Sequence, residues 1–185
     1  SGRDLQVFTK GGEFFLPQST LDPITPSNVV VNGATRRGSL EGIKPVGAES
    51  GTLFVQRAGK SLREFLFSDV ELSYISNNIS LLSSHLLKSP VDMALRKATS
   101  TTDGDLLLLV NSTDGSLATY SILRGQNVIA PSLSTTGASG EFQRVAVDVD
   151  QIYFVVKRTI NSGTKYYVEC FNDDNTTDSC ILFSG

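Results

Sequence analysis

The feature that most constrains the fold of this chain is a recurring pair of short apolar runs joined by a turn. The pattern is most complete in residues 141–171, where three strand-like runs are separated by two turns. Val145, Val147 and Val149 alternate with Ala146, Asp148 and Asp150, and residues 152–156 are almost wholly apolar, which is typical of β-strands. Residues 161–163 (Asn-Ser-Gly) tolerate positive φ, so the second and third runs can close into a hairpin. The segment is therefore predicted to form an antiparallel meander.

Three earlier parts of the chain repeat an apolar run, a glycine-containing turn and a second strand. The three turns contain Gly11-Gly12, Ala58-Gly59 and Asp114-Gly115. The hairpins begin about 45–55 residues apart, which is within the range of a four-stranded propeller blade plus insertions. The sequence therefore predicts an all-β fold of β-propeller-like blades built from repeated antiparallel meanders. About four blade-like repeats would form a single domain over residues 1–185.

Shorter runs supply the remaining strands of these repeats. We expect outer strands at 28–31 and 127–130, inner strands at 43–46 and 91–95, and a last strand at 180–183. Nothing ahead of residue 5 could serve as the inner strand of the first repeat. We therefore expect this chain to be a fragment of a longer protein, with incomplete propeller closure and at most weak self-association.

One segment departs from the strand pattern. Ile79, Leu82 and Leu86 fall on one helical face, and Ser89-Pro90 would end a helix. The sequence predicts one short helix between Asn77 and Lys88, inserted between the second and third blades.

The charge balance limits the classes of partner. The chain has 16 Lys and Arg residues against 19 Asp and Glu residues, and the basic residues are scattered. A surface evolved to grip nucleic-acid phosphates would be basic, so we expect any contact with nucleic acid to be weak. The longest apolar runs have the length of strands, and no membrane span is expected.

Few residues in the sequence suit catalysis. The single histidine, His85, has no second histidine or suitably spaced cysteine to complete a metal site, so we expect a surface or packing role. A nucleophilic site would also have to use His85, and no nucleophile elbow surrounds it. Asp148 and Asp150 are predicted on one side of a strand, which suits either a carboxylate pair or a solvated sheet edge. An enzyme is therefore not expected.

The remaining candidate ligands are also weak. The two cysteines, Cys170 and Cys180, are too few for a disulfide framework, and Cys170 is expected to be a buried reduced thiol. The carboxylates of Asp173–Asp178 could hold calcium, but the order of a known calcium loop is missing. The sequence thus predicts no catalytic, cofactor-binding or metal-binding residues, and no cofactor.

Short motifs along nearly the whole chain occur in a specific order. They are VFTKGGEF (7–14), ITPSNV (24–29), KPV (44–46), LFVQR (53–57), LREF (62–65), LLSSHL (81–86), VDMA (91–94), DGSL (114–117), VAV (145–147) and VVKRTI (155–160). This order resembles the tail nozzle proteins of short-tailed bacteriophages, also called tail tubular protein B-like proteins. Each motif alone is weak, and the resemblance rests on their collinearity.

The resemblance implies a structural virion protein of β-propeller architecture. Such a protein assembles in the bacterial host cytoplasm into a homo-oligomeric ring at the phage tail. There it contacts other tail proteins, namely the adaptor and the tail fibres, and conducts DNA transiently during ejection. An acidic chain fits a conduit, because a channel lined with cations would hold DNA.

The alternative is a host-surface receptor-binding or adhesion domain of a virion, with a polysaccharide-cleaving enzyme as a more distant possibility. Receptor binding would favour exposed aromatic residues on loops such as 19–27 or 135–140, and these loops contain none.

Overall fold

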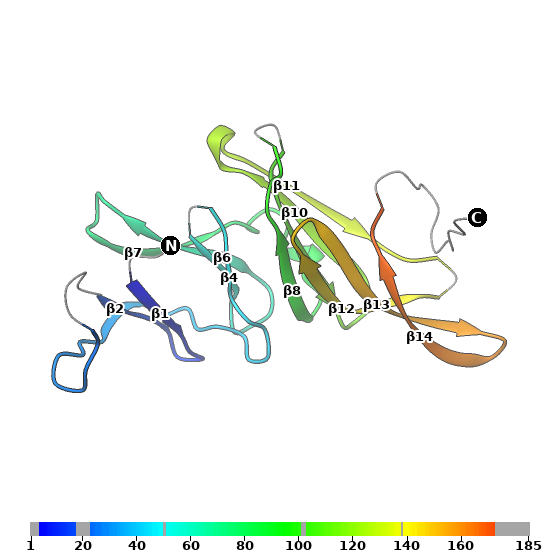
Figure 1. The fold of residues 1–185 in the computed structure, drawn as a ribbon, viewed down its shortest axis with the longest axis horizontal. Helices are drawn as coiled ribbons and strands as arrows, with labels where there is room; N and C mark the ends of the chain where they lie inside the picture. The colour runs from blue at the N-terminus through cyan, green and yellow to red at the C-terminus, as the bar shows by residue number, and fades with distance from the viewer. Residues whose placement is uncertain (1–3, 18–22, 50, 101–102, 138, 173–185) are drawn as a thin grey trace. The chain divides into compact units, whose positions relative to one another are not determined.

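The computed structural model describes residues 4–17, 23–49, 51–100, 103–137 and 139–172. They divide into two compact units, unit 1 (Ser1–Leu87) and unit 2 (Lys88–Gly185), which are described separately. Each unit contains one three-stranded and one four-stranded antiparallel sheet (Figure 1). In all four sheets, hydrogen-bonded neighbours are consecutive along the chain. The predicted all-β fold of repeated antiparallel meanders is confirmed at this level.

Unit 1 contains the strands β1 to β7. The first sheet has the order β1-β2-β3 and the second the order β4-β5-β6-β7. The bounds are β1 (Asp4–Phe8), β2 (Glu13–Pro17), β3 (Asn32–Thr35), β4 (Val46–Gly47), β5 (Thr52–Val55), β6 (Leu62–Ser68) and β7 (Ser73–Asn78).

An aromatic cluster joins the two sheets of unit 1. Phe65 and Tyr74 are buried and stack with ring centroids 4.8 Å apart and planes 6° from parallel. Phe8, from the other sheet, meets Phe65 edge-on at 5.4 Å. Offset-stacked and edge-to-face ring pairs are favoured geometries, so these contacts stabilise the unit beyond simple burial of apolar area. The cluster also includes Phe15, Phe54 and Phe67.

Unit 2 contains the strands β8 to β14. Its four-stranded sheet has the order β11-β10-β9-β8, and its three-stranded sheet the order β12-β13-β14. The bounds are β8 (Pro90–Arg96), β9 (Asp105–Asn111), β10 (Leu117–Leu123), β11 (Val128–Ser134), β12 (Glu141–Asp148), β13 (Gln151–Ile160) and β14 (Gly163–Cys170), with a 3₁₀ turn η2 (Arg124–Gln126) before β11.

The core of unit 2 is mainly aliphatic. Leu108 and Val110 from β9 pack with side chains of β12 and β13 that lie on one face of their sheet. The alternation of β13 explains this face, because its even-numbered residues from Ile152 to Arg158 are buried. The cluster consists of Leu108, Val110, Leu117, Val145, Ile152, Phe154 and Val156.

Two predicted turns have the backbone geometry that their residues favour. Asn161 and Ser162 have φ of 50° and 62° and form a two-residue turn, since Ile160 pairs directly with Gly163. Positive φ at both positions is the hairpin geometry whose twist matches the flanking strands. Gly115 has φ of 63°, and an added Cβ would lie only 2.4 Å from a Glu141 atom, so the turn requires glycine there.

Two short predicted strands are displaced in the structure. Residues 28–31 are not a strand, because the chain turns where the Asn28 and Val29 N–H groups both donate to the Thr25 carbonyl. The outer strand is β3, which starts at Asn32. Of the inner strand expected at 43–46, only Val46 belongs to β4. The strands expected at 91–95 and 127–130 overlap β8 and β11, and β9 and β10 flank the predicted turn at Asp114-Gly115.

The short helix predicted between Asn77 and Lys88 is wrong. β7 extends through Asn78 and pairs with β6, and the segment then contains only the 3₁₀ turn η1 (Ser84–Leu86). The apolar residues that suggested a helical face are not buried together, since Leu82 is 94% exposed. The Leu62 N–H of β6 bonds to the buried Ser80 hydroxyl, so β6 takes its partners from this segment. Pairing of this segment with β6 is therefore more favourable than the helix that the spacing of its apolar residues predicts.

No helix among the described residues is long and apolar enough to cross a membrane. The predicted last strand at 180–183 lies outside the described residues. The prediction of a single domain over residues 1–185 stays a prediction.

Candidate functional site

The acidic and histidine residues that the sequence singled out lie on different elements. His85 is exposed in the 3₁₀ turn η1. Asp148 ends β12, whereas Asp150 lies in the turn that follows, after Val149 with φ of 54°. The prediction that both aspartates share one face of a strand is wrong, because the chain reverses between them. Both aspartates are exposed. Across the described part of the chain, no group of three or more His, Cys, Asp or Glu residues could hold a metal ion.

Two further predictions concern the C-terminal region. Cys170 is a free thiol, but the expectation that it is buried is wrong. It is the last residue of β14 and projects from the exposed side of an edge strand, so no second layer covers it. The possible calcium ligands Asp173–Asp178 lie outside the described residues.

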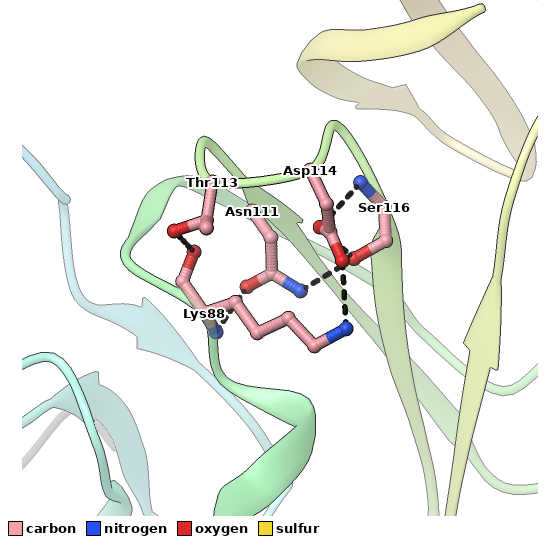
Figure 2. A network of polar contacts seen from close by, with 5 residues as sticks. All are labelled: Lys88, Asn111, Thr113, Asp114 and Ser116. Atoms are coloured by element: carbon pink, nitrogen blue, oxygen red, sulfur yellow. Dashed lines mark hydrogen bonds and ion pairs between the residues drawn. The ribbon is translucent and has the colours of Figure 1, made fainter. Parts of the chain in front are cut away.

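The most connected polar cluster lies at one end of the β9–β10 hairpin (Figure 2). We call it the hairpin-end network. Asn111 and Ser116 are fully buried, and the Asn111 Nδ2 donates to the Ser116 Oγ at 3.0 Å. The Asn111 Oδ1 accepts the backbone N–H of Lys88 at 2.9 Å. The network consists of Lys88, Asn111, Thr113, Asp114 and Ser116.

Asp114 connects the buried part of this network to its exposed part. Its Oδ1 accepts from the Ser116 hydroxyl at 2.6 Å and from the Ser116 N–H at 3.1 Å. Its Oδ2 accepts from the Lys88 Nζ at 2.7 Å. Burial alone would raise the pKa of Asp114. The bonds from Lys88 and Ser116 favour the carboxylate and outweigh burial, so the pKa lies below its ordinary value of 3.8.

The hairpin-end network ties the turn of one hairpin to the segment that enters β8. The Thr113 hydroxyl adds a bond to the Lys88 carbonyl at 3.0 Å. The side chains of Asn111, Thr113 and Asp114 thus pair the Lys88 N–H, the Lys88 carbonyl and the Ser116 N–H at this end of the hairpin. We assign the network a bracing role. The sequence predicted the turn at Asp114-Gly115 but not its link to Lys88, which is distant along the chain.

Unit 1 contains a second buried polar group, Glu13. Its Oε2 accepts from the Thr35 hydroxyl at 2.5 Å and from the Arg37 N–H at 3.1 Å. Its Oε1 has no partner among the described residues. The pKa of Arg63 lies below its ordinary value, because the Arg63 side chain is partly buried and the Arg37 guanidinium is nearby. The Glu13 carboxylate has the opposite effect and raises this pKa. Because Glu13 is fully buried, it suits a structural role in joining β2 to β3 better than contact with a ligand.

Several exposed apolar residues of unit 2 share the side of the β12–β14 sheet that faces away from the core. We call it the outer face. Direct cross-strand pairs on this face are Tyr153 with Cys170 and Val155 with Val168. Val168 is 77% exposed and Tyr166 is 64% exposed, although both residue types favour burial. The outer face consists of Ala146, Tyr153, Val155, Tyr166, Val168 and Cys170.

β14 also has an unpaired edge. Within the described residues it is hydrogen-bonded only to β13, and it lies at one end of its sheet (Figure 1). Unpaired strand edges and exposed apolar sheet faces are the surfaces through which β-proteins associate. The outer face and the β14 edge therefore form the candidate interaction surface. The run of residues 165–168 (Lys-Tyr-Tyr-Val) was the available signal in the sequence, but it does not distinguish a buried strand from an exposed edge.

Comparisons with known proteins do not add an assignment. No protein-family model matches this chain, and no curated protein matches it.

Proposed function

We propose that this chain is a structural module of a short-tailed bacteriophage tail nozzle, part of the conduit through which DNA is ejected. The observation that carries the proposal is the repetition of one unit, a sheet whose strand order follows the chain order, four times in succession. In this proposal the four sheets are propeller-like blades. The collinear motifs that resemble the nozzle family lie on the strands of these sheets and in the segments that connect them.

The contacts within each unit support the reading of sheets as blades. Successive sheets pack face to face through Phe8 and Phe65 in unit 1, and through Leu108 and Val156 in unit 2. Blades of a propeller pack on their neighbours in this way. The exposed outer face of the β12–β14 sheet is then a blade face that meets a further part of the virion.

The proposed environment is the virion tail, with the adaptor, the tail fibres and copies of the same protein as neighbours. The formal net charge of −3 supports a conduit role, since an acidic wall would not retain DNA phosphates. The proposal includes no catalytic step and no cofactor.

Immunolabelling of intact virions tests this function. Antibodies raised against the purified chain are applied to virions of the phage that encodes it, and the label is located by electron microscopy. We expect label at the tail end, and antibodies first absorbed with the chain should give none. Label confined to the capsid, or no specific label on opened and intact particles alike, would overturn the proposal.

A host-surface binding domain is the second candidate. The exposed Tyr153 and Tyr166 favour it, because tyrosine is enriched at binding hot spots. These residues lie on strands of a sheet, whereas the loop 135–137 has no aromatic residue. Binding of the purified chain to host cells or to a glycan array at micromolar affinity, lost in a Tyr153→Ala variant, would place this candidate first.

A further inference from the structure

The edge strands of this protein differ in how well they are protected against pairing with another strand. β11 contains Pro131 and β8 begins with Pro90, and proline lacks the N–H that a new ladder would need. β4 has only two residues. These features protect an edge, and β14 has none of them.

The other edge of the β12–β14 sheet is already engaged. On β12, the Val145 N–H donates to the Asp92 Oδ2 at 3.0 Å, and the Phe142 N–H donates to the Gly115 carbonyl at 2.9 Å. A register shift between Phe142 and Arg144 also interrupts the strand. Among the described residues, the open edge of this sheet is therefore β14, which has eight residues, all of them partly or fully exposed.

The register within the hairpin shows which backbone groups of β14 face outward. The Phe171 N–H donates to the Ile152 carbonyl at 2.9 Å. Because hydrogen-bonding direction alternates along an antiparallel strand, odd-numbered residues of β14 bond to β13. The N–H and C=O groups of Thr164, Tyr166, Val168 and Cys170 therefore point away from the sheet.

The charges on β14 lack balance within one copy. Lys165 lies directly opposite Arg158 on β13, so two cations share one face. Glu169 binds Arg158 through two bonds of 2.7 and 2.8 Å, and Arg158 is nearly buried. Lys165 itself has no acidic partner among the described residues. Like charges placed directly opposite each other are unfavourable in a sheet, so this face gains from an added carboxylate.

We propose that β14 pairs with β14 of a second copy of this chain, antiparallel about a two-fold axis at Tyr167. In this register Lys165 lies opposite Glu169 of the second copy, and the same pair forms twice. Tyr166 and Val168 of the two copies exchange the outward N–H and C=O groups. Shifting the register by two residues either way moves Lys165 opposite Tyr167 or Phe171, and the charge match is lost.

The pairing would join two three-stranded sheets into one continuous sheet. Lys165–Glu169 and Tyr167–Tyr167 are non-hydrogen-bonded pairs in this register, the positions where opposed side chains come closest. On the other side, Tyr166 and Val168 extend the outer face across both copies. Addition of a strand to an exposed edge is an established mode of association in β-proteins. The charge pattern of β14 therefore favours β14 of a second copy as the strand that pairs with this edge.

A two-fold contact closes at two copies, so this dimer is separate from the ring of the proposed function. If virion labelling fails while the dimer forms, only the proposed function is lost. If labelling succeeds while the chain is monomeric, only the dimer is lost.

The first experiment is sedimentation velocity of the full chain over a range of concentrations. A single strand pair buries little area, so we expect a dissociation constant on the order of 10–100 µM. Lys165→Glu converts two attractive contacts into two repulsive ones and should weaken the dimer by about tenfold or more. Lys60→Glu makes the same charge change at an exposed site in unit 1 and should leave the constant unchanged. Circular dichroism confirms that each variant is folded.

The second experiment tests the register by disulfide cross-linking. In a chain carrying Cys170→Ser and Cys180→Ser, Tyr167→Cys places one thiol from each copy opposite the other. Tyr166→Cys, in the same background, places them at offset positions too far apart to bridge easily. We expect a covalent dimer on mild oxidation with Tyr167→Cys and at most a trace with Tyr166→Cys.

Three results would overturn the proposal. A chain that stays monomeric throughout the concentration range has no such contact. Equal cross-linking of the two cysteine variants shows a different register. If a dimer forms only after residues 173–185 are removed, that segment of the same chain is what pairs with the β14 edge in the full chain.

Discussion

In unit 1 the facing sheets meet through aromatic rings, whereas in unit 2 they meet mainly through aliphatic side chains. Phe8 meets Phe65 at 5.4 Å between the two sheets of unit 1, and Leu108 packs with Val156 in unit 2. Both units nevertheless have the same composition of sheets, one with three strands and one with four. The spacing of strands and turns along the chain therefore sets the number of strands in each sheet. The side-chain type then sets how strongly the facing sheets are held together.

The largest effect is expected from Phe65→Ala in unit 1. The substitution removes a fully buried ring that contacts both Tyr74 and Phe8. We expect it to lower the free energy of unfolding by about 3–5 kcal/mol, because transfer, cavity and ring-pair contributions are lost together. Urea unfolding followed by circular dichroism measures this. Phe171→Ala, at a half-exposed position, is the matched control. An equal loss of stability in this variant would show that the ring contacts of Phe65 contribute little.

A somewhat smaller effect is expected from Leu108→Ala in unit 2. Leu108 is buried in the aliphatic cluster, and its truncation should lower the free energy of unfolding by about 2–5 kcal/mol, toward the lower end where neighbours can relax into the space. Leu82→Ala, at an exposed position, should change it by less than about 0.5 kcal/mol. A loss larger than that of Phe65→Ala would reverse the ranking of the two cores.

The buried part of the hairpin-end network gives the next effect. Asn111→Ala leaves the Lys88 N–H without its acceptor and removes the N–H that the Ser116 Oγ accepts, and should lower the free energy of unfolding by about 1–3 kcal/mol. Ser112→Ala removes an exposed hydroxyl bond from the same hairpin and serves as the control. Hydrogen exchange should quicken at Lys88 and in the turn that follows Asn111. Unchanged exchange there would contradict the bracing role.

The smallest effect is the pH dependence that comes from Asp114. Its folded-state pKa is lowered, so its contribution is complete above the ordinary value of 3.8 and is lost as pH falls through the lower folded value. Both Asp114 and Lys88 are more than a third exposed, and solvent screening should keep the contribution below about 1 kcal/mol. The stability difference between the chain and Asp114→Asn should therefore shrink below pH 3.8. A difference that grows with acidity would show the opposite sign.

Strands were predicted best where the local sequence pattern and the contacts of the folded protein favour the same element. Residues 106–110 form an uninterrupted apolar run, and the last five residues of β9 are all buried. The helix predicted between Asn77 and Lys88 failed because β6 required a partner, which no local period reveals. The strand at 28–31 failed because a turn at Thr25 bonds Asn28 and Val29 in another way.

The candidate interaction surface was less accessible to prediction than the strands. The aromatic and β-branched character of residues 165–168 predicts a strand equally well in the middle or at the edge of a sheet. Cys170 was expected to be buried for the same reason, and it is exposed. Exposure of an edge depends on whether another segment pairs with it, and this is a property of the assembled sheet.

The sequence alone was enough to predict the all-β class, the hairpin turns and the apolar run of β9, because φ preference and side-chain pattern act within a few residues. Only the tertiary structure decided that Ser73–Asn78 is a strand, that Lys88 joins Asn111 and Asp114, and that β14 ends its sheet. Each of these depends on hydrogen-bond partners far apart in the chain, and backbone groups accept whichever partner the fold brings to them.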